Sequence, residues 1–148
     1  MKNLALIFCL LASSFVACSN NIPAKNVPSI VVNAFKADFP AADKVEWEKR
    51  KGNYEAEFKL DSVEHHAKFT ADGRKLMQKK EITEGALPVV INSLLKSQFS
   101  NYLTDGIEQV IKDGITYYQV ELETKGKPDK KIVFSADGKE NSALPYWD

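Results

Sequence analysis

A six-residue pattern occurs twice in this chain, each time at the end of a run in which apolar and polar residues alternate. It reads Phe-Thr-Ala-Asp-Gly-Arg at residues 69–74 and Phe-Ser-Ala-Asp-Gly-Lys at residues 134–139. Asp-Gly pairs turn a chain between antiparallel strands because glycine adopts a positive φ at little cost and aspartate tolerates it. The two patterns therefore predict two equivalent turns, and with them a chain built from two copies of one unit.

Helical spacing of apolar residues precedes each alternating run and supports the repeat. Each helical stretch begins near a proline, which costs no hydrogen bond in the first turn of a helix. The residues of the second stretch lie sixty positions after those of the first: Pro28, Ile30, Val31, Ala34, Phe35 and Phe39 are followed by Pro88, Val90, Ile91, Leu94, Leu95 and Phe99. The first helix is expected to end before Pro40, because the residue before a proline avoids the helical region.

After each helix the period of the apolar residues changes to two, which predicts antiparallel strands. We expect an α+β fold, a tandem repeat of a helix followed by a four-stranded antiparallel meander, with the helices packed on one face of the sheet. The expected units are residues 27–83 and 84–148, and the last strand is degenerate because it closes at Leu144-Pro145. A unit of about sixty residues is barely stable alone, so the two are expected to pack together or to share one sheet.

The expected strand registers follow from the turn residues. Two-residue turns at Gly52-Asn53, Asp61-Ser62 and Asp113-Gly114, and a loop at residues 125–129, give both units one apolar face. They place Trp47 opposite Phe58, Phe58 opposite His65, Ile107 opposite Val120, and Leu122 opposite Ile132. On that face Phe69 and Phe134 are predicted to be equivalent buried residues beneath the helices.

The N-terminus predicts export from the cytoplasm. Lys2 is followed by an apolar run over residues 4–15, which is too short to span a bilayer and typical of a signal peptide. The run ends in Val-Ala-Cys, which resembles the bacterial lipoprotein signal. We therefore expect a signal peptide over residues 1–17, lipidation of Cys18 and a tether over residues 18–26. Location on the periplasmic side of a bacterial membrane, more specifically the outer membrane, would follow. The alternative, an ordinary signal peptide and secretion to the periplasm, is disfavoured by the bulky Phe15.

Composition and spacing argue against several function classes. Lys plus Arg equals Asp plus Glu at 20 each, so the basic excess of a nucleic-acid binder is missing. Cys9 leaves with the leader, so the mature sequence offers no thiol pair. The two histidines are His65 and His66, whose side chains are expected on opposite faces of a strand, and the sequence has no GxGxxG motif or P-loop. We expect no enzyme activity and no cofactor.

The helix, meander and leader together resemble the PepSY-like, β-lactamase-inhibitor-like family of bacterial envelope proteins. The phrases that carry the resemblance are Val27-Pro28, Phe35-Lys36, Phe39-Pro40, Val45-Glu46-Trp47-Glu48 and residues 69–73. The resemblance covers nearly the whole mature chain. It implies an antiparallel sheet whose open face binds a protein or peptide, and it implies no catalytic residues.

The sheet face away from the helices is the expected site. In the first unit it carries a predicted row of Glu48, Glu57 and His66, which would suit either a solvated charged surface or a divalent metal, and the charged surface is the favoured reading. In the second unit it carries Val110, Tyr117 and Val133, which indicate a partner contact unless the Tyr146-Trp147 tail covers them.

The expected function is therefore a lipid-anchored envelope binding module for an unidentified protein or peptide, with inhibition of a periplasmic enzyme as one form of it. The alternative is a lipoprotein that binds a small ligand or a metal. The contact candidates under the first reading are the six residues of the sheet face, Val110, Tyr117, Val133, Glu48, Glu57 and His66.

Overall fold

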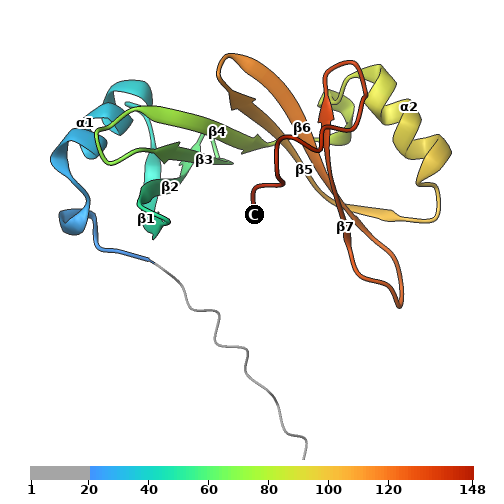
Figure 1. Cartoon of the computed structure of the whole chain (residues 1–148), viewed down its shortest axis with the longest axis horizontal. Coiled ribbons are helices and arrows are strands. Elements are labelled where there is room, and N and C mark those ends of the chain that lie inside the picture. The colour runs from blue at the N-terminus through green and yellow to red at the C-terminus, as the bar shows by residue number, and fades with distance from the viewer. Residues whose placement is uncertain (1–20) are drawn as a thin grey trace, which may run out of the picture.

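The computed structural model describes residues 21–148 and contains two helices and seven strands (Figure 1). The expected signal peptide and Cys18 lie outside the described residues. In chain order, after a 3-10 turn at Ala24–Asn26, the elements are α1 (Ser29–Asp38), β1 (Asp43–Arg50), β2 (Asn53–Leu60), β3 (Val63–Phe69) and β4 (Lys75–Glu81), then a 3-10 turn at Glu84–Ala86, α2 (Val89–Gln98), β5 (Leu103–Lys112), β6 (Ile115–Glu123) and β7 (Lys130–Ser135).

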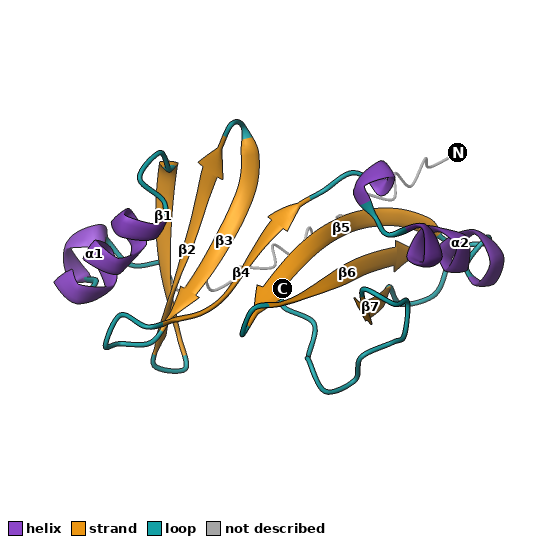
Figure 2. Cartoon of the chain, turned by 90° about the horizontal axis from the view of Figure 1, so that it is seen from above, coloured by secondary structure: helices purple, strands orange, loops and turns teal. Residues whose placement is uncertain are grey.

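All seven strands belong to one antiparallel sheet, in the order β1 to β7. The two units join where β4 pairs with β5, from Met77 opposite Lys112 to Glu81 opposite Glu108. Figure 2 shows the strands of the second unit continuing the sheet of the first. The pairing removes two edges that would otherwise present unpaired backbone groups to solvent. The units therefore share one sheet, which is one of the two arrangements left open by the sequence.

Both helices lie on the same side of this sheet, at opposite ends of the molecule (Figure 1). Each covers its own apolar cluster, in which Val31 and Phe35 of α1 correspond to Ile91 and Leu95 of α2. These pairs are sixty positions apart, and all four side chains are buried. Each helix therefore uses the same stripe to cover the apolar face of its own strands. The predicted α+β fold with tandem repeats is confirmed.

The second unit differs from the first in its fourth strand. The expected strand is reduced to a single bridge between Phe134 and Glu140. Asn141 Oδ1 then accepts hydrogen bonds from the backbone N–H groups of Ala143 and Leu144, both at 3.0 Å, and turns the chain. Pro145 follows and has no N–H to donate to a ladder. The chain therefore leaves the sheet after β7, and the fourth strand of this unit, which was expected to be degenerate, is reduced to this bridge.

Two of the four expected registers are also shifted. Trp47 pairs with Ala56 rather than Phe58, because the first hairpin turns at Lys51-Gly52, whose φ angles are 49° and 83°. A two-residue turn of this type needs a positive φ at both central residues, and here a lysine adopts one. The shift is two residues, so every side chain keeps its predicted face.

The hairpin of β6 and β7 is shifted in the same way, with Leu122 opposite Lys130 rather than Ile132. The turns at Asp61-Ser62 and Asp113-Gly114 form as predicted, with positive φ at all four residues. Phe58 accordingly lies opposite His65, and Ile107 lies opposite Val120, as expected.

Part of the expected tether lies on the fold. The Ile22 N–H donates to the carbonyl oxygen of Trp47 at 2.8 Å, and the Ile22 side chain packs against the first apolar cluster. An edge strand offers free backbone acceptors, which explains why this segment lies along β1 instead of extending as a linker. Within residues 21–148, neither helix is long and apolar enough to cross a membrane.

The equivalence of Phe69 and Phe134 can be tested by replacing each side chain with that of alanine. Their side chains are 0% and 1% exposed. Each change to Ala should lower the free energy of unfolding by about 3–5 kcal/mol, because it removes a buried ring and leaves a cavity. Urea denaturation measures this change. Val89→Ala on α2, at a side chain 82% exposed, is the control and should change stability by less than about 0.5 kcal/mol.

The repeated Asp-Gly turn packs against the start of a helix in both units. Gly73 has φ +86°, and a Cβ there would lie 3.0 Å from the Ile30 carbonyl oxygen; at Gly138 a Cβ would lie 2.9 Å from Val90 Cγ2. The turn therefore has no room for a side chain, in addition to requiring a positive φ.

Comparison of Gly73→Ala with Gly52→Ala separates these two requirements. Gly52 has φ +83° but nothing within 4 Å of its Cβ position. Gly52→Ala should cost about 1–2 kcal/mol from backbone strain alone. Gly73→Ala should cost clearly more, because the backbone of α1 must also move. Equal urea midpoints for the two variants would show that the contact between turn and helix imposes no constraint.

Candidate functional site: the helix-free face of the sheet

The face of the sheet opposite α1 and α2, the helix-free face, is covered at its centre by the end of the chain. The residues Leu144–Asp148, called here the C-terminal segment, lie across this face (Figure 1). Leu144 and Trp147 are buried there against Val110 and Val133. The segment therefore builds a third apolar cluster on the side of the sheet that carries no helix.

The three apolar candidates from the sequence come together in this cluster. Val110 and Val133 are 0% and 5% exposed, and Tyr117 is half-buried beside them. The two valines are therefore not open to a partner while this segment covers them. The alternative, in which the tail containing Tyr146 and Trp147 covers them, describes the structure.

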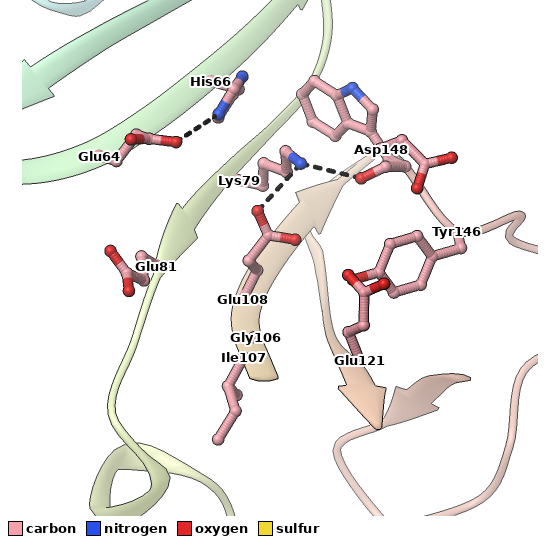
Figure 3. A pocket seen from close by; sticks show the side chains of 11 residues that line it. Glu64, His66, Lys79, Glu81, Gly106, Ile107, Glu108, Glu121, Tyr146 and Asp148 are labelled. Atoms are coloured by element: carbon pink, nitrogen blue, oxygen red, sulfur yellow. Dashed lines mark hydrogen bonds and ion pairs between the residues drawn. The ribbon is translucent and has the colours of Figure 1, made fainter. Parts of the chain in front are cut away.

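Buried polar side chains hold the main chain of Trp147. Its N–H donates to Gln119 Oε1 at 3.2 Å, and its carbonyl oxygen accepts from Gln119 Nε2 at 2.8 Å and from Lys79 Nζ at 2.9 Å. Lys79 also pairs with Glu108 at 2.9 Å (Figure 3). Gln119 and Lys79 are only 1% and 5% exposed. Burial of such groups is costly unless they are paired, so the segment completes a polar network that the strands prepare.

The Trp147 side chain has its own set of partners. Its indole N–H donates to Glu55 Oε1 at 2.8 Å. The ammonium groups of Lys68 and Lys79 lie 4.4 and 5.2 Å from the centre of the indole ring, within the range of cation–π attraction. These partners come from β2, β3 and β4, whereas Gln119 belongs to β6. Trp147 therefore contacts both units, the first through its indole ring and the second through its main chain.

Glu55 is the acidic centre of this arrangement. Burial raises the pKa of its carboxyl group, but His66, the Lys68 charge and the indole N–H outweigh burial and hold the pKa below its usual value. Its Oε2 lies 3.4 Å from Lys68 Nζ, and its Oε1 lies 3.7 Å from His66 Nδ1. The carboxylate therefore stays ionised at neutral pH and remains an acceptor for the indole.

The predicted row of Glu48, Glu57 and His66 does not form as expected. The shifted first hairpin places Glu48 opposite Glu55, while Glu57 lies opposite Glu46 on one side and His66 on the other. Glu48 pairs instead with Arg50 at 2.6 Å. Within residues 21–148 no group of three or more His, Cys, Asp or Glu side chains is placed to hold a metal ion.

Two hollows of opposite charge flank the C-terminal segment. One, of about 470 Å³, is lined by four glutamates together with His66 and Lys79 (Figure 3): Glu64, Glu81, Glu108 and Glu121. The other, of about 430 Å³, has four cations against one acidic residue, Asp148, in its lining: Arg50, Lys51, Lys68 and Lys112. A molecule that contacts this face thus meets an acidic side and a basic side with an apolar, aromatic strip between them.

Sequence reasoning missed Lys79 and Gln119 as members of the site. Both follow the alternation that assigns them to the helix-free face, but nothing local distinguishes them from solvated polar residues. The available signal was the Tyr146-Trp147 pair, two large aromatic residues that follow a proline outside any periodic run.

Glu55→Leu tests whether the carboxylate holds the segment, and Glu57→Leu is its matched control. Both residues lie on the same face of β2, but Glu55 is 6% exposed and Glu57 is exposed. Glu55→Leu should lower the free energy of unfolding by about 1–3 kcal/mol, since it leaves a buried indole N–H without an acceptor. Glu57→Leu should have little effect. Urea denaturation measures the stability of both variants, and the tryptophan fluorescence of the folded state shows whether the surroundings of Trp147 change. An equal loss of stability in the two variants would argue against this role of Glu55.

Comparison with known proteins identifies the fold. A solved structure of a DUF2874 family protein from Bacteroides uniformis is 22% identical, with 76% of this chain and 85% of that chain covered and a TM-score of 0.71. A structure from Bacteroides eggerthii named as a putative periplasmic protein is 23% identical, with 77% and 85% covered and a TM-score of 0.69. A BLIP-like protein from Bacteroides fragilis is 23% identical, with 80% and 91% covered and a TM-score of 0.66.

No curated protein matches the chain. The family described as "Putative beta-lactamase-inhibitor-like, PepSY-like" matches it twice, over residues 15–73 and 53–140. The two matches reflect the tandem repeat and together extend over both units. This chain therefore belongs to the PepSY-like, beta-lactamase-inhibitor-like family.

Proposed function

We propose that this chain is a lipid-anchored cell-envelope module that binds a protein or a peptide through the helix-free face of its sheet. The observation that carries the proposal is the way this face holds the chain's own C-terminal segment. Lys79 and Gln119 bind a main chain, and Glu55 binds a side chain. Groups placed in this way recognise polypeptide, because they satisfy backbone polar groups as well as an aromatic anchor.

The charge around the segment supports a protein partner. The acidic and basic hollows provide a polar rim beside an apolar centre, which is the usual layout of a recognition surface. Glu57 remains exposed on the same face, and Glu48, His66 and Tyr117 are partly exposed. These four residues are the proposed first contacts, and Val110 and Val133 form the floor beneath the segment.

The comparisons favour a binding role over catalysis. The family description and the Bacteroides fragilis relative both refer to inhibitor-like proteins. We therefore propose that the partner is an envelope protein and that one form of the activity is inhibition of a periplasmic enzyme. The Bacteroides eggerthii relative, named as periplasmic, supports the same compartment, and the leader favours the periplasmic side of the outer membrane.

Anchoring is tested at Cys18. Acylation of this residue should hold the protein on membranes, since several acyl chains anchor stably where one chain holds weakly. Cys18→Ala should release the protein into the soluble fraction or leave the precursor uncut. Mass spectrometry of the wild-type N-terminus should find the lipid, and an unmodified N-terminal peptide would refute the anchor.

The binding face is tested by site-specific photo-crosslinking in cells. A photoreactive phenylalanine replaces Glu57 on the helix-free face or, as the control, Lys36 on α1; both positions are exposed. A defined adduct should form from position 57 and not from position 36. Adducts from position 36 alone would move the binding site to the helices and contradict the proposal.

A further inference from the structure

The C-terminal segment is attached to the fold in a way that allows it to leave without disturbing the sheet. Its last contact with the ladder is the Asn141 N–H, which donates to the Val133 carbonyl oxygen at 2.7 Å. Ser142 and Ala143 are exposed, and the pairing of the seven strands involves no residue of Leu144–Asp148. Release therefore requires rotation at residues 141–143 and breaks none of the strand pairs.

The site left behind would be a formed but unfilled binding site. Its floor would consist of Val110 and Val133, which the segment now buries. Its polar groups, Lys79 and Gln119, would lose their partners in the Trp147 main chain. Because exposing the apolar floor to water carries a free-energy cost, the empty site favours being refilled, either by the segment or by another chain.

The chemistry of the site selects tryptophan among the aromatic residues. Glu55 Oε1 accepts from a donor that belongs to the ring itself, the indole N–H. Phe has no donor, and the only donor of Tyr is an O–H that projects beyond the far end of its ring. Lys68 and Lys79 lie near the ring, and cation–π attraction is strongest for tryptophan. Gln119 takes both the N–H and the carbonyl of the same residue, so the occupant must present an accessible main chain, as an extended segment does.

We infer that Leu144–Asp148 is a ligand held in cis, and that a partner binds this face by inserting a tryptophan-bearing extended segment of its own in place of Trp147. This rests on the proposed function and names the chemistry that the partner brings. The tethered segment competes at an effective concentration on the order of millimolar. Only a partner that adds contacts in the flanking charged hollows displaces it, so the segment suppresses weak binding to the wrong chains.

Exchange of the segment can be measured with a peptide that carries its sequence. The probe is a fluorescent peptide, Ala-Leu-Pro-Tyr-Trp-Asp, corresponding to residues 143–148, and the protein is residues 21–148. Trp147→Ala should bind the probe about tenfold more tightly than wild type. In this variant the segment no longer occupies the site, so a larger fraction of the protein is free to bind the peptide. A matched peptide with Phe in place of Trp should bind about tenfold more weakly than the probe, since it lacks the N–H donor. Lys36→Glu on α1 should behave as wild type.

Other outcomes overturn the inference. Equal affinities of wild type and Trp147→Ala for the probe would show that the docked segment does not compete with it. Equal affinities for the two peptides would show that the site has no preference for tryptophan. A Trp147→Ala chain that fails to fold, as seen by circular dichroism, would show that the segment is a permanent part of the core.

Hydrogen exchange provides a second measurement on the unaltered chain. The Trp147 main-chain and indole N–H groups should exchange through an opening of lower free energy than the Val120 N–H of β6, because the segment opens locally. Equal protection would mean that the segment opens only when the whole protein unfolds, which would sink the inference. Crosslinks from position 57 without peptide exchange would support the proposed function and refute the inference about the C-terminal segment. Peptide exchange without such crosslinks would support the inference about the segment and count against the proposed function.

Discussion

The pairing of β4 with β5 is the interaction on which the rest of this structure depends. Each unit of about sixty residues would be only marginally stable alone. Joining them edge to edge gives one sheet with only two free edges, and the ends of the chain partly cover both, through Ile22 along β1 and Glu140 beside β7. The same pairing also aligns the helix-free faces of the two units. Without that alignment, a segment that begins at the end of the second unit would not reach Glu55 in the first.

The two faces of the sheet are covered by different kinds of interaction. The helix side is held mainly by apolar burial, in two clusters that repeat the same positions sixty residues apart. The other side combines a small apolar cluster with buried charges, Glu55 and Lys79, whose partners lie in distant parts of the chain. Apolar packing is non-directional, whereas buried charges need particular partners in good geometry. This difference is the physical basis for the recognition that we propose for the helix-free face.

Much of the architecture could be predicted because it is encoded over short distances. Positive φ at Asp61-Ser62 and Asp113-Gly114 fixes two hairpins, and alternation with period two assigns each side chain to a face. The errors arose where local rules allow more than one answer. Lys51 adopts a positive φ that the rules assign more readily to Asn53, so the first hairpin moved by two residues and Glu48 lies opposite Glu55 instead of Glu57. The faces remained correct because a shift of two preserves them.

By itself, the sequence determined the repeat, the helices, the faces of the sheet and the membership of Val110, Tyr117 and Val133 in one surface. Tertiary structure alone decided that the two units form one sheet and that Trp147 fills the centre of the helix-free face. The reason is distance along the chain. A turn or an alternating run is specified by neighbours, but the place of Trp147 depends on Glu55, 92 positions away. The C-terminal segment has no periodicity of its own, so only the assembled sheet, with its buried polar groups, determines where it lies.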